Sequence, residues 1–158
     1  MVDLALSVFE KERVSIKLSP AGRYNDMFDA DPKATYGYLL SELDKRQIGF
    51  VEIMRPNGEK PLYGHQPPME QFPDMVSFFR EHFKGVIIGN QGYDPETAEK
   101  DVESKLVDLV SFARLHIVNP DLYERIVNGW PVEAKQDMSK WFGGGAEGYT
   151  TPAKYAHL

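Results

Sequence analysis

The run GVIIGNQGYDPE contains the residues best suited to bind an anion, because a β-branched stretch leads directly into Gly89, Asn90 and Gly92. Glycine lets the backbone approach a ligand closely, and exposed N–H groups at the end of a strand can surround a phosphate group. Turn glycines between a strand and a helix are also commonly structural. At this point the run indicates either a phosphate site or an ordinary turn.

A second candidate lies in LVDLVSFARLHIVNPD, where Ala113 and Arg114 follow another apolar stretch. In barrels of alternating strands and helices, phosphate sites often form from the loops after the last two strands. The planar guanidinium group of Arg114 would offer a fixed fork to phosphate oxygens. Pairing of this arginine with a helix carboxylate is the alternative, but two such loops in tandem favour a phosphate site.

The third candidate is Lys17, a cation inside the apolar stretch Val14–Leu18. Lysine is rarely buried unless it is paired or functional. A side chain that reaches solvent from the end of a strand is the alternative.

Composition excludes several classes of site. The chain of 158 residues has a formal net charge of −6 and no cysteine, which disfavours nucleic acid as a partner and excludes disulfides and thiol chemistry. The histidines lack the spacing of a metal site, so we assign no metal ligand and no catalytic residue; they are His65, His82, His116 and His157. Any redox activity would therefore need a bound cofactor.

Four short apolar segments must position the candidate residues, and turns and helical stretches separate them. The segments are Val14–Leu18, Gly49–Met54, Gly85–Asn90 and Leu106–Phe112. This alternation predicts an α/β fold with a parallel sheet that is buried on both faces. No apolar run approaches the ~20 residues of a membrane helix, so we expect a soluble, cytoplasmic protein without a membrane partner.

Three helices have a readable start, because Asp31, Asp94 and Asn119 are each followed by proline. An Asx side chain can cap a helix whose first residue is proline. Helical periodicity places Leu39, Leu40 and Leu43 on one side of the first of these helices. Gly129 is expected to end the last helix, because glycine readily adopts the left-handed conformation of a helix C-terminus.

Two segments fit neither strand nor helix: the Pro/Gly-rich loop at 55–73, and the Gly-rich aromatic tail at 137–158. A closed (β/α)8 barrel needs eight strands and ~250 residues. The sequence offers four strands, so it predicts half a barrel or a small open sheet.

The segments RVSIKLSPAGRYNDMFDADPKATYGYLL, GVIIGNQGYDPETAEKDV, LVDLVSFARLHIVNPDLYERIVNG and WFGGGAEGYTT resemble the C-terminal part of the Old Yellow Enzyme family of NADH:flavin oxidoreductases, in matching order and spacing. The resemblance implies a (β/α)8 TIM barrel that holds FMN at its mouth, of which residues 1–158 form the C-terminal half, with strands five to eight. NADH or NADPH reduces the flavin in that family, and the flavin reduces activated alkenes such as enones.

By resemblance, Gly89, Asn90, Ala113 and Arg114 occupy the phosphate-binding positions, and Lys17 and Phe142 also contact the flavin. Lys17 stands where the family usually has arginine, near the flavin pyrimidine ring, where a cation stabilises negative charge on the reduced flavin. The family commonly has glycine at the position of Ala113, and we expect the additional methyl group to tighten that turn. Phe142 replaces a tyrosine and keeps only the aromatic ring.

The resemblance also implies that the first four strands are absent, together with the pair that holds the substrate carbonyl and the tyrosine that donates a proton. We therefore expect a fragment that needs an N-terminal half for ene-reductase activity. Because a half barrel leaves strand edges unpaired, we expect self-association or a complementary half barrel. The alternative is a non-catalytic half barrel that binds a phosphate ligand or a partner chain.

Overall fold

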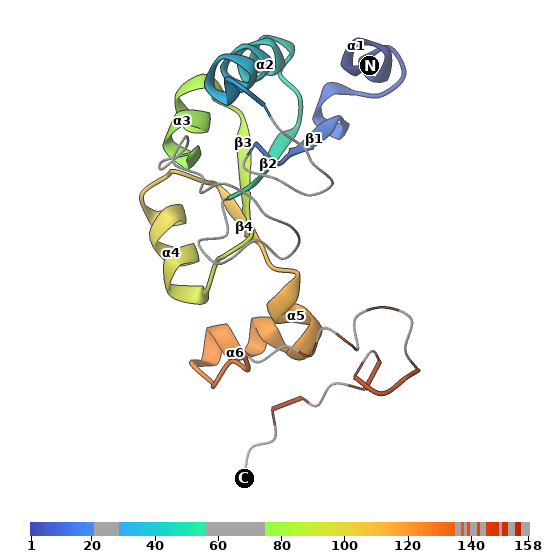
Figure 1. Cartoon of the computed structure of the whole chain (residues 1–158), viewed down its shortest axis with the longest axis vertical. Coiled ribbons are helices and arrows are strands. Elements are labelled where there is room, and N and C mark those ends of the chain that lie inside the picture. The colour runs from blue at the N-terminus through green and yellow to red at the C-terminus, as the bar shows by residue number, and fades with distance from the viewer. Residues whose placement is uncertain are drawn as a thin grey trace. The chain divides into compact units, whose positions relative to one another are not determined.

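The computed structural model describes residues 1–20, 29–55 and 75–134, together with residues 137, 139, 142, 145–148, 150, 151, 154 and 155. The chain divides into two compact units, Met1–Ser111 and Phe112–Leu158, which are considered separately. Figure 1 shows the elements of each unit. Most of the predicted loop at 55–73, and much of the predicted tail at 137–158, lie outside the described residues.

The first unit is built on a parallel sheet of four strands in the order β1-β2-β3-β4. The strands are β1 (Ser15–Leu18), β2 (Phe50–Met54), β3 (Val86–Asn90) and β4 (Leu109–Ser111), and the intervening helices are α2 (Pro32–Arg46), α3 (Met75–His82) and α4 (Pro95–Glu103). Parallel neighbours that are joined through a helix form the repeating unit of a (β/α)8 barrel. The predicted α/β class and the βα alternation are therefore confirmed.

Strand β4 is shorter than the predicted segment Leu106–Phe112. The backbone N–H groups of Leu106 and Val107 donate to the carbonyl of Asp101, at 3.0 and 3.2 Å, and so belong to the turn after α4. Asp108 then anchors the start of the strand, because its carboxylate accepts from the Ile87 N–H at 2.8 Å and from Arg80 at 2.6 Å. Burial alone would raise the pKa of Asp108, but these two hydrogen bonds hold it below its usual value.

The two faces of the sheet differ in burial. Val51, Ile53 and Ile87 are fully buried, on the face against which Leu40, Leu43 and Phe79 of the helices pack. Figure 1 shows α2, α3 and α4 along one side of the sheet. On the other face Leu109 is 56% exposed. Among the described residues, the helices therefore cover one face of the sheet, and the face that carries Leu109 is open.

The predicted starts of α2 and α4 are confirmed. The Asp31 side chain accepts from the Ala34 N–H at 3.0 Å, and the Asp94 side chain accepts from the Thr97 N–H at 2.8 Å. Each cap satisfies a backbone donor that has no partner within its helix. Helix α2 buries Leu40 and Leu43, as the apolar spacing predicts, and ends where Gln47 adopts a left-handed conformation.

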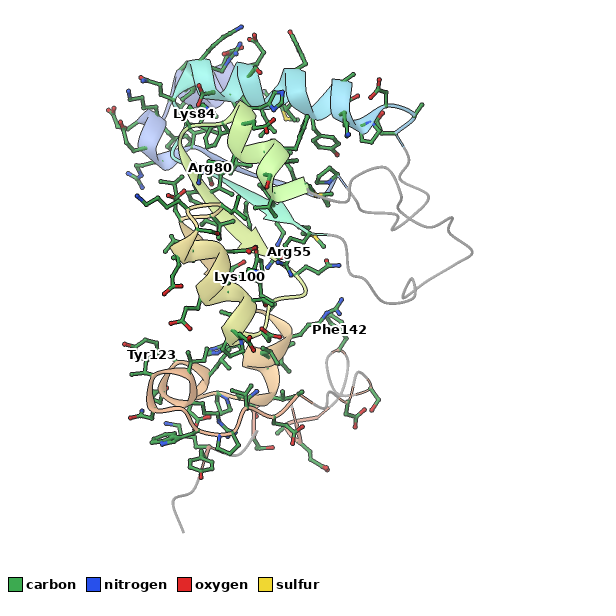
Figure 2. All side chains as sticks on the ribbon, turned by 90° about the vertical axis from the view of Figure 1, so that its left-hand side faces the viewer. Arg55, Arg80, Lys84, Lys100, Tyr123 and Phe142 are labelled. Carbon is green, nitrogen blue, oxygen red and sulfur yellow. The ribbon has the colours of Figure 1, made fainter. Side chains whose placement is uncertain are left out.

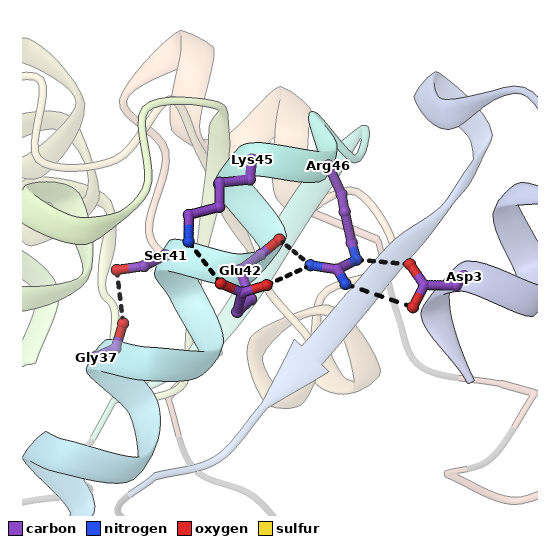
Figure 3. Close-up of polar contacts among 6 residues, drawn as sticks. All are labelled: Asp3, Gly37, Ser41, Glu42, Lys45 and Arg46. Carbon is purple, nitrogen blue, oxygen red and sulfur yellow. Dashed lines mark hydrogen bonds and ion pairs between the residues drawn. The ribbon is translucent and has the colours of Figure 1, made fainter.

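The short helix α1 (Val2–Leu6) is tied to α2 by charged side chains (Figure 3). Arg46 donates to Asp3 at 2.7 Å and to Glu42 at 2.8 Å, and Lys45 also pairs with Glu42. Ion pairs of this exposed kind are worth at most about 1 kcal/mol each. The apolar residues of α1 that pack on the core are therefore the larger contribution to its placement; they are Val2, Ala5 and Leu6.

The second unit contains α5 (Arg114–Val118) and α6 (Leu122–Asn128). The predicted helix cap at Asn119 is wrong. Asn119 instead ends α5, and its fully buried side chain donates to the carbonyl groups of Leu115 and Glu133, at 2.8 and 2.9 Å. A buried amide makes as many hydrogen bonds as it can, and the Glu133 backbone is a partner that local sequence does not reveal. Gly129 ends α6 with φ 66°, as predicted.

Candidate functional site

The carboxyl end of the sheet carries a network of polar side chains, one from each strand. Lys17 Nζ donates to Glu52 Oε1 at 3.0 Å and to Asn90 Oδ1 at 3.2 Å. Carboxyl ends of parallel strands lie at the same edge of a sheet, which is where α/β proteins bind ligands. Of the residues proposed from sequence, the structure therefore brings Lys17 and Asn90 into contact.

Ser111 closes this network into a ring. Its hydroxyl donates to Glu52 Oε1 at 2.8 Å and accepts from Asn90 Nδ2 at 2.7 Å. We call Lys17, Glu52, Asn90 and Ser111 the mouth network. The polar groups of the Asn90 side chain are therefore committed to this network.

Lys17 is paired but not buried. Its side chain is 48% exposed, compared with 22% for Glu52, so the side-chain cation expected inside a strand lies at the strand end and reaches solvent. An ammonium group has three N–H donors. Two of them have acceptors in the mouth network, and the third has no acceptor among the described residues. Lys17 can therefore donate to a ligand without leaving Glu52.

Gly89 is required by packing. A Cβ atom at this position would lie 2.5 Å from Tyr93 Oη and 2.8 Å from Tyr93 Cε2. Contacts this short do not occur between real atoms, so any side chain at residue 89 would displace the ring. The glycine that the sequence suggested for ligand approach thus has a demonstrable role in seating Tyr93 beside the strand.

Arg55, which follows β2, forms hydrogen bonds with the loop between β3 and α4 (Figure 2). Its backbone N–H donates to the Asn90 carbonyl at 2.9 Å, and its guanidinium group donates to the Gly92 carbonyl at 2.9 Å and to Asp101 at 3.2 Å. Tyr93 completes the arrangement by donating to Asp101 at 2.9 Å. Burial, helped by the Asp101 carboxylate, raises the pKa of Tyr93 to about 12.

The orientation of the loop carbonyls determines where the loop N–H groups point. In a trans peptide the C=O and the following N–H point in opposite directions, and the chain has no cis peptide bond. Because the carbonyls of Asn90 and Gly92 face Arg55, the N–H groups of Gln91 and Tyr93 face away from it. Within the described residues, the N–H groups of Gln91, Gly92 and Tyr93 have no acceptor. Neighbouring free N–H groups suit an anion.

Side chains of the chain itself already accept hydrogen bonds from backbone N–H groups at the start of α4. Asp94 and Thr97 form a capping box in which each residue's side chain accepts from the other's backbone N–H. The hydrogen bonds from Thr97 lower the pKa of Asp94, so its carboxylate keeps its negative charge. An anion would therefore meet the loop N–H groups rather than the first turn of α4.

Ala113, Arg114 and Phe142 belong to the second unit. Ala113 precedes α5 with φ −104°, a conformation open to any residue, so the backbone at this position does not require glycine. Arg114 begins α5 and has no carboxylate partner among the residues that the structure describes. The Phe142 side chain is among the exposed hydrophobic groups at 84% (Figure 2).

The described part of the chain holds no group of three or more His, Cys, Asp and Glu side chains that could bind a metal ion. His82 instead contacts the Phe78 carbonyl at 2.9 Å, while His65 and His157 lie outside the described residues. None of the helices in the described ranges is long and apolar enough to cross a membrane.

Sequence reasoning missed Glu52, Ser111 and Arg55. Glu52 had a usable signal, because a carboxylate in the middle of the apolar segment FVEIM is unusual. Its register partner is Lys17, which makes the pair natural once β1 and β2 are neighbours. Nothing in the local sequence identifies Ser111 or Arg55, since their partners lie on other strands and in another loop.

Comparison with known proteins identifies the family. The profile of the NADH:flavin oxidoreductase / NADH oxidase family matches residues 2–133. A probable flavin mononucleotide-dependent alkene reductase of Leishmania infantum is 32% identical over 149 residues, covering 94% of this chain and 38% of the relative. The 12-oxophytodienoate reductase 1 of Oryza sativa subsp. japonica is 31% identical over 150 residues, covering 90% of this chain and 36% of the relative.

Solved structures agree with the sequence comparison. Morphinone reductase matches with a TM-score of 0.80 and 32% identity, over 98% of this chain and 39% of its own. The old yellow enzyme from Trypanosoma cruzi matches with a TM-score of 0.84 and 25% identity, over 98% of this chain and 38% of its own. The chain thus spans less than two-fifths of the length of these relatives, and its parallel strands form part of a (β/α)8 barrel of the Old Yellow Enzyme type. This chain belongs to the NADH:flavin oxidoreductase / NADH oxidase family.

Proposed function

We propose that this chain is the FMN-binding part of an oxidoreductase that uses NADH or NADPH to reduce activated alkenes such as enones, and that an N-terminal half completes the enzyme. The family match and the alkene reductase among the relatives support the reaction class. The observation that carries the proposal is the contact of Lys17 with Asn90 at 3.2 Å, directly before three loop N–H groups without an acceptor among the described residues.

The phosphate group of FMN would be held by the backbone around Gly89 and Asn90, and by Ala113 and Arg114. Asn90 pairs with Ser111 in the sheet, and a single residue separates Ser111 from Ala113. Without a carboxylate partner among the described residues, the Arg114 guanidinium group is available to phosphate oxygens.

The ring system of the flavin would meet Lys17 and Phe142. The free N–H of Lys17 suits a carbonyl oxygen of the flavin pyrimidine, and its positive charge suits the reduced flavin. The exposed ring of Phe142 offers an apolar wall but no hydroxyl. Bound FMN would supply the hydride chemistry, whereas these residues bind and orient it. No catalytic acid or base is assigned to this chain.

Titration with FMN and with riboflavin, which lacks the phosphate group, tests the proposal. We expect the purified chain to quench flavin fluorescence and to bind FMN about tenfold more tightly than riboflavin. Arg114→Ala should remove most of this difference and leave riboflavin binding unchanged. Lys100→Ala is the matched control, because it removes one positive charge from an exposed position of α4. If Arg114→Ala lowered the affinity for FMN and for riboflavin equally, the result would contradict the role of Arg114 in phosphate binding.

A non-catalytic half barrel that binds a phosphate ligand or a partner chain is the second candidate. The observation that favours it is the 56% exposure of Leu109, on the face of the sheet opposite the helices. Bleaching of a bound flavin by NADPH would support the enzyme, whereas FMN binding without bleaching would support the second candidate. Self-association and a cytoplasmic location remain predictions from the sequence.

A further inference from the structure

We propose that Glu52 is a positioning residue: it fixes the ammonium group of Lys17 at the mouth of the sheet and reduces the positive charge that Lys17 presents to a bound flavin. The inference deepens the proposed function and rests on it for the identity of the ligand. It concerns a residue that neither the sequence pattern nor the resemblance singled out.

Residues of β1 and β4 hold the Glu52 carboxylate, one from each side of β2. Its Oε1 atom accepts from Lys17 at 3.0 Å and from Ser111 at 2.8 Å. Ser111 is fixed in turn by Asn90 Nδ2 at 2.7 Å. A carboxylate that accepts from partners on both sides has little freedom, so it defines where the ammonium group of Lys17 can lie.

The two side chains of the ion pair differ in their exposure to solvent. The Glu52 side chain is 22% exposed and the Lys17 side chain is 48% exposed, so the carboxylate lies deeper and the ammonium group lies nearer to solvent. Among the described residues, Glu52 is the only carboxylate that forms an ion pair with Lys17. A ligand at the mouth network would therefore contact the Lys17 ammonium group, whose positive charge is partly neutralised by the less exposed Glu52 carboxylate.

The charge balance has a consequence for a redox cofactor. Reduced flavin carries more negative charge on its pyrimidine ring than oxidised flavin, so an uncompensated cation favours the reduced form. A carboxylate at hydrogen-bonding distance from that cation opposes the preference. At the separations and effective dielectric constant of a partly exposed site, one charge changes the ratio of the two affinities about tenfold.

The first experiment needs no flavin. Lysine side chains are acetylated with a short pulse of acetic anhydride, and the modification of Lys17 is quantified by mass spectrometry with Lys100 as the internal reference. We expect Lys17 to react about threefold faster in Glu52→Gln than in the natural chain, because the ammonium group loses its fixed partner. Ser111→Ala should shift the rate in the same direction by less. Glu99→Gln, on an exposed face of α4, controls for the lost charge. An unchanged Lys17 rate in Glu52→Gln overturns the positioning role.

The second experiment measures the affinity of the same variants for oxidised and for reduced FMN. We expect Glu52→Gln to raise the preference for reduced FMN about tenfold, which corresponds to a midpoint potential about 30 mV more positive. Lys17→Met should lower the preference. An unchanged preference in Glu52→Gln, with normal FMN binding, overturns the inference and leaves the proposed function intact. A natural chain that binds no flavin overturns the proposed function and the charge-setting part of this inference, while the acetylation result still decides the positioning part.

Discussion

The guanidinium carbon of Arg55 lies 3.6 Å from the centroid of the Tyr93 ring. This stacking joins the end of β2 to the loop between β3 and α4, and hydrogen bonds from Arg55 to the Asn90 and Gly92 carbonyls reinforce it. Cation–π contacts of this kind contribute up to about 2 kcal/mol when they are shielded from water. The loop whose N–H groups are offered to an anion is therefore shaped by a residue on a different strand.

Arg55→Lys should separate charge from geometry. Lysine keeps the positive charge but lacks the planar fork that reaches the Gly92 carbonyl and Asp101 together. We expect a loss of about 1–2 kcal/mol in the free energy of unfolding, measured with urea, and a smaller preference for FMN over riboflavin. Arg46→Lys, in the exposed pair with Asp3, is the matched control and should change stability by less than about 0.5 kcal/mol. Equal effects of the two substitutions would argue against a special role for Arg55.

Gly89→Ala should disturb the same loop by overpacking. The added Cβ atom would lie 2.5 Å from Tyr93 Oη, so the ring must move. Overpacking of this kind costs about 1–3 kcal/mol, which urea unfolding would detect. Gly145→Ala is the control, because nothing lies within 4 Å of its Cβ position. A Gly89→Ala chain as stable as the natural one would show that the loop accommodates a side chain.

Tyr93 should make stability depend on alkaline pH. Its pKa in the folded chain is raised to about 12 from an ordinary value of 10.0, so between these values the folded state binds more protons than the unfolded state. The free energy of unfolding must then fall as the pH rises from about 10 to about 12, by roughly 1–3 kcal/mol for this group.

Tyr93→Phe should abolish that part of the pH dependence. The stability difference between the natural chain and Tyr93→Phe is expected to shrink between pH 9 and pH 12, as measured by urea unfolding at each pH. Tyr123→Phe, at an exposed position of α6, controls for the titration of tyrosine in general. A difference that stays constant with pH would mean that Tyr93 titrates normally.

The open face of the sheet should promote self-association. Leu109 is 56% exposed on β4, one of the two outer strands of the described sheet. We expect light scattering after size exclusion to show a mass that rises with protein concentration, and Leu109→Lys to lower it, since an inward charge on an edge strand opposes pairing. Val127→Lys, at an exposed position of α6, should have no such effect. A natural chain that stays monomeric at every concentration would contradict the prediction.

Local sequence determined the elements and several of their boundaries. Each of the first three strands begins one residue after its predicted start, at Ser15, Phe50 and Val86. The caps at Asp31 and Asp94 are present because the capping side chain and its backbone partner lie within three residues of each other. Lys17 and Asn90 both stand near the carboxyl ends of their predicted strands, which parallel strands bring to one edge, although their contact joins residues 73 positions apart.

Only tertiary structure decided the partners. Glu52 and Ser111 are 59 residues apart, and Arg55 and Asp101 are 46 residues apart, so neither contact follows from local spacing. The cap predicted at Asn119 failed for the same reason, because the distant Glu133 backbone competes for its side chain. Short-range hydrogen bonds and periodicity are properties of neighbouring residues and can be read from the sequence. Strand register and the satisfaction of buried polar groups are properties of the folded chain, because they depend on which segments meet.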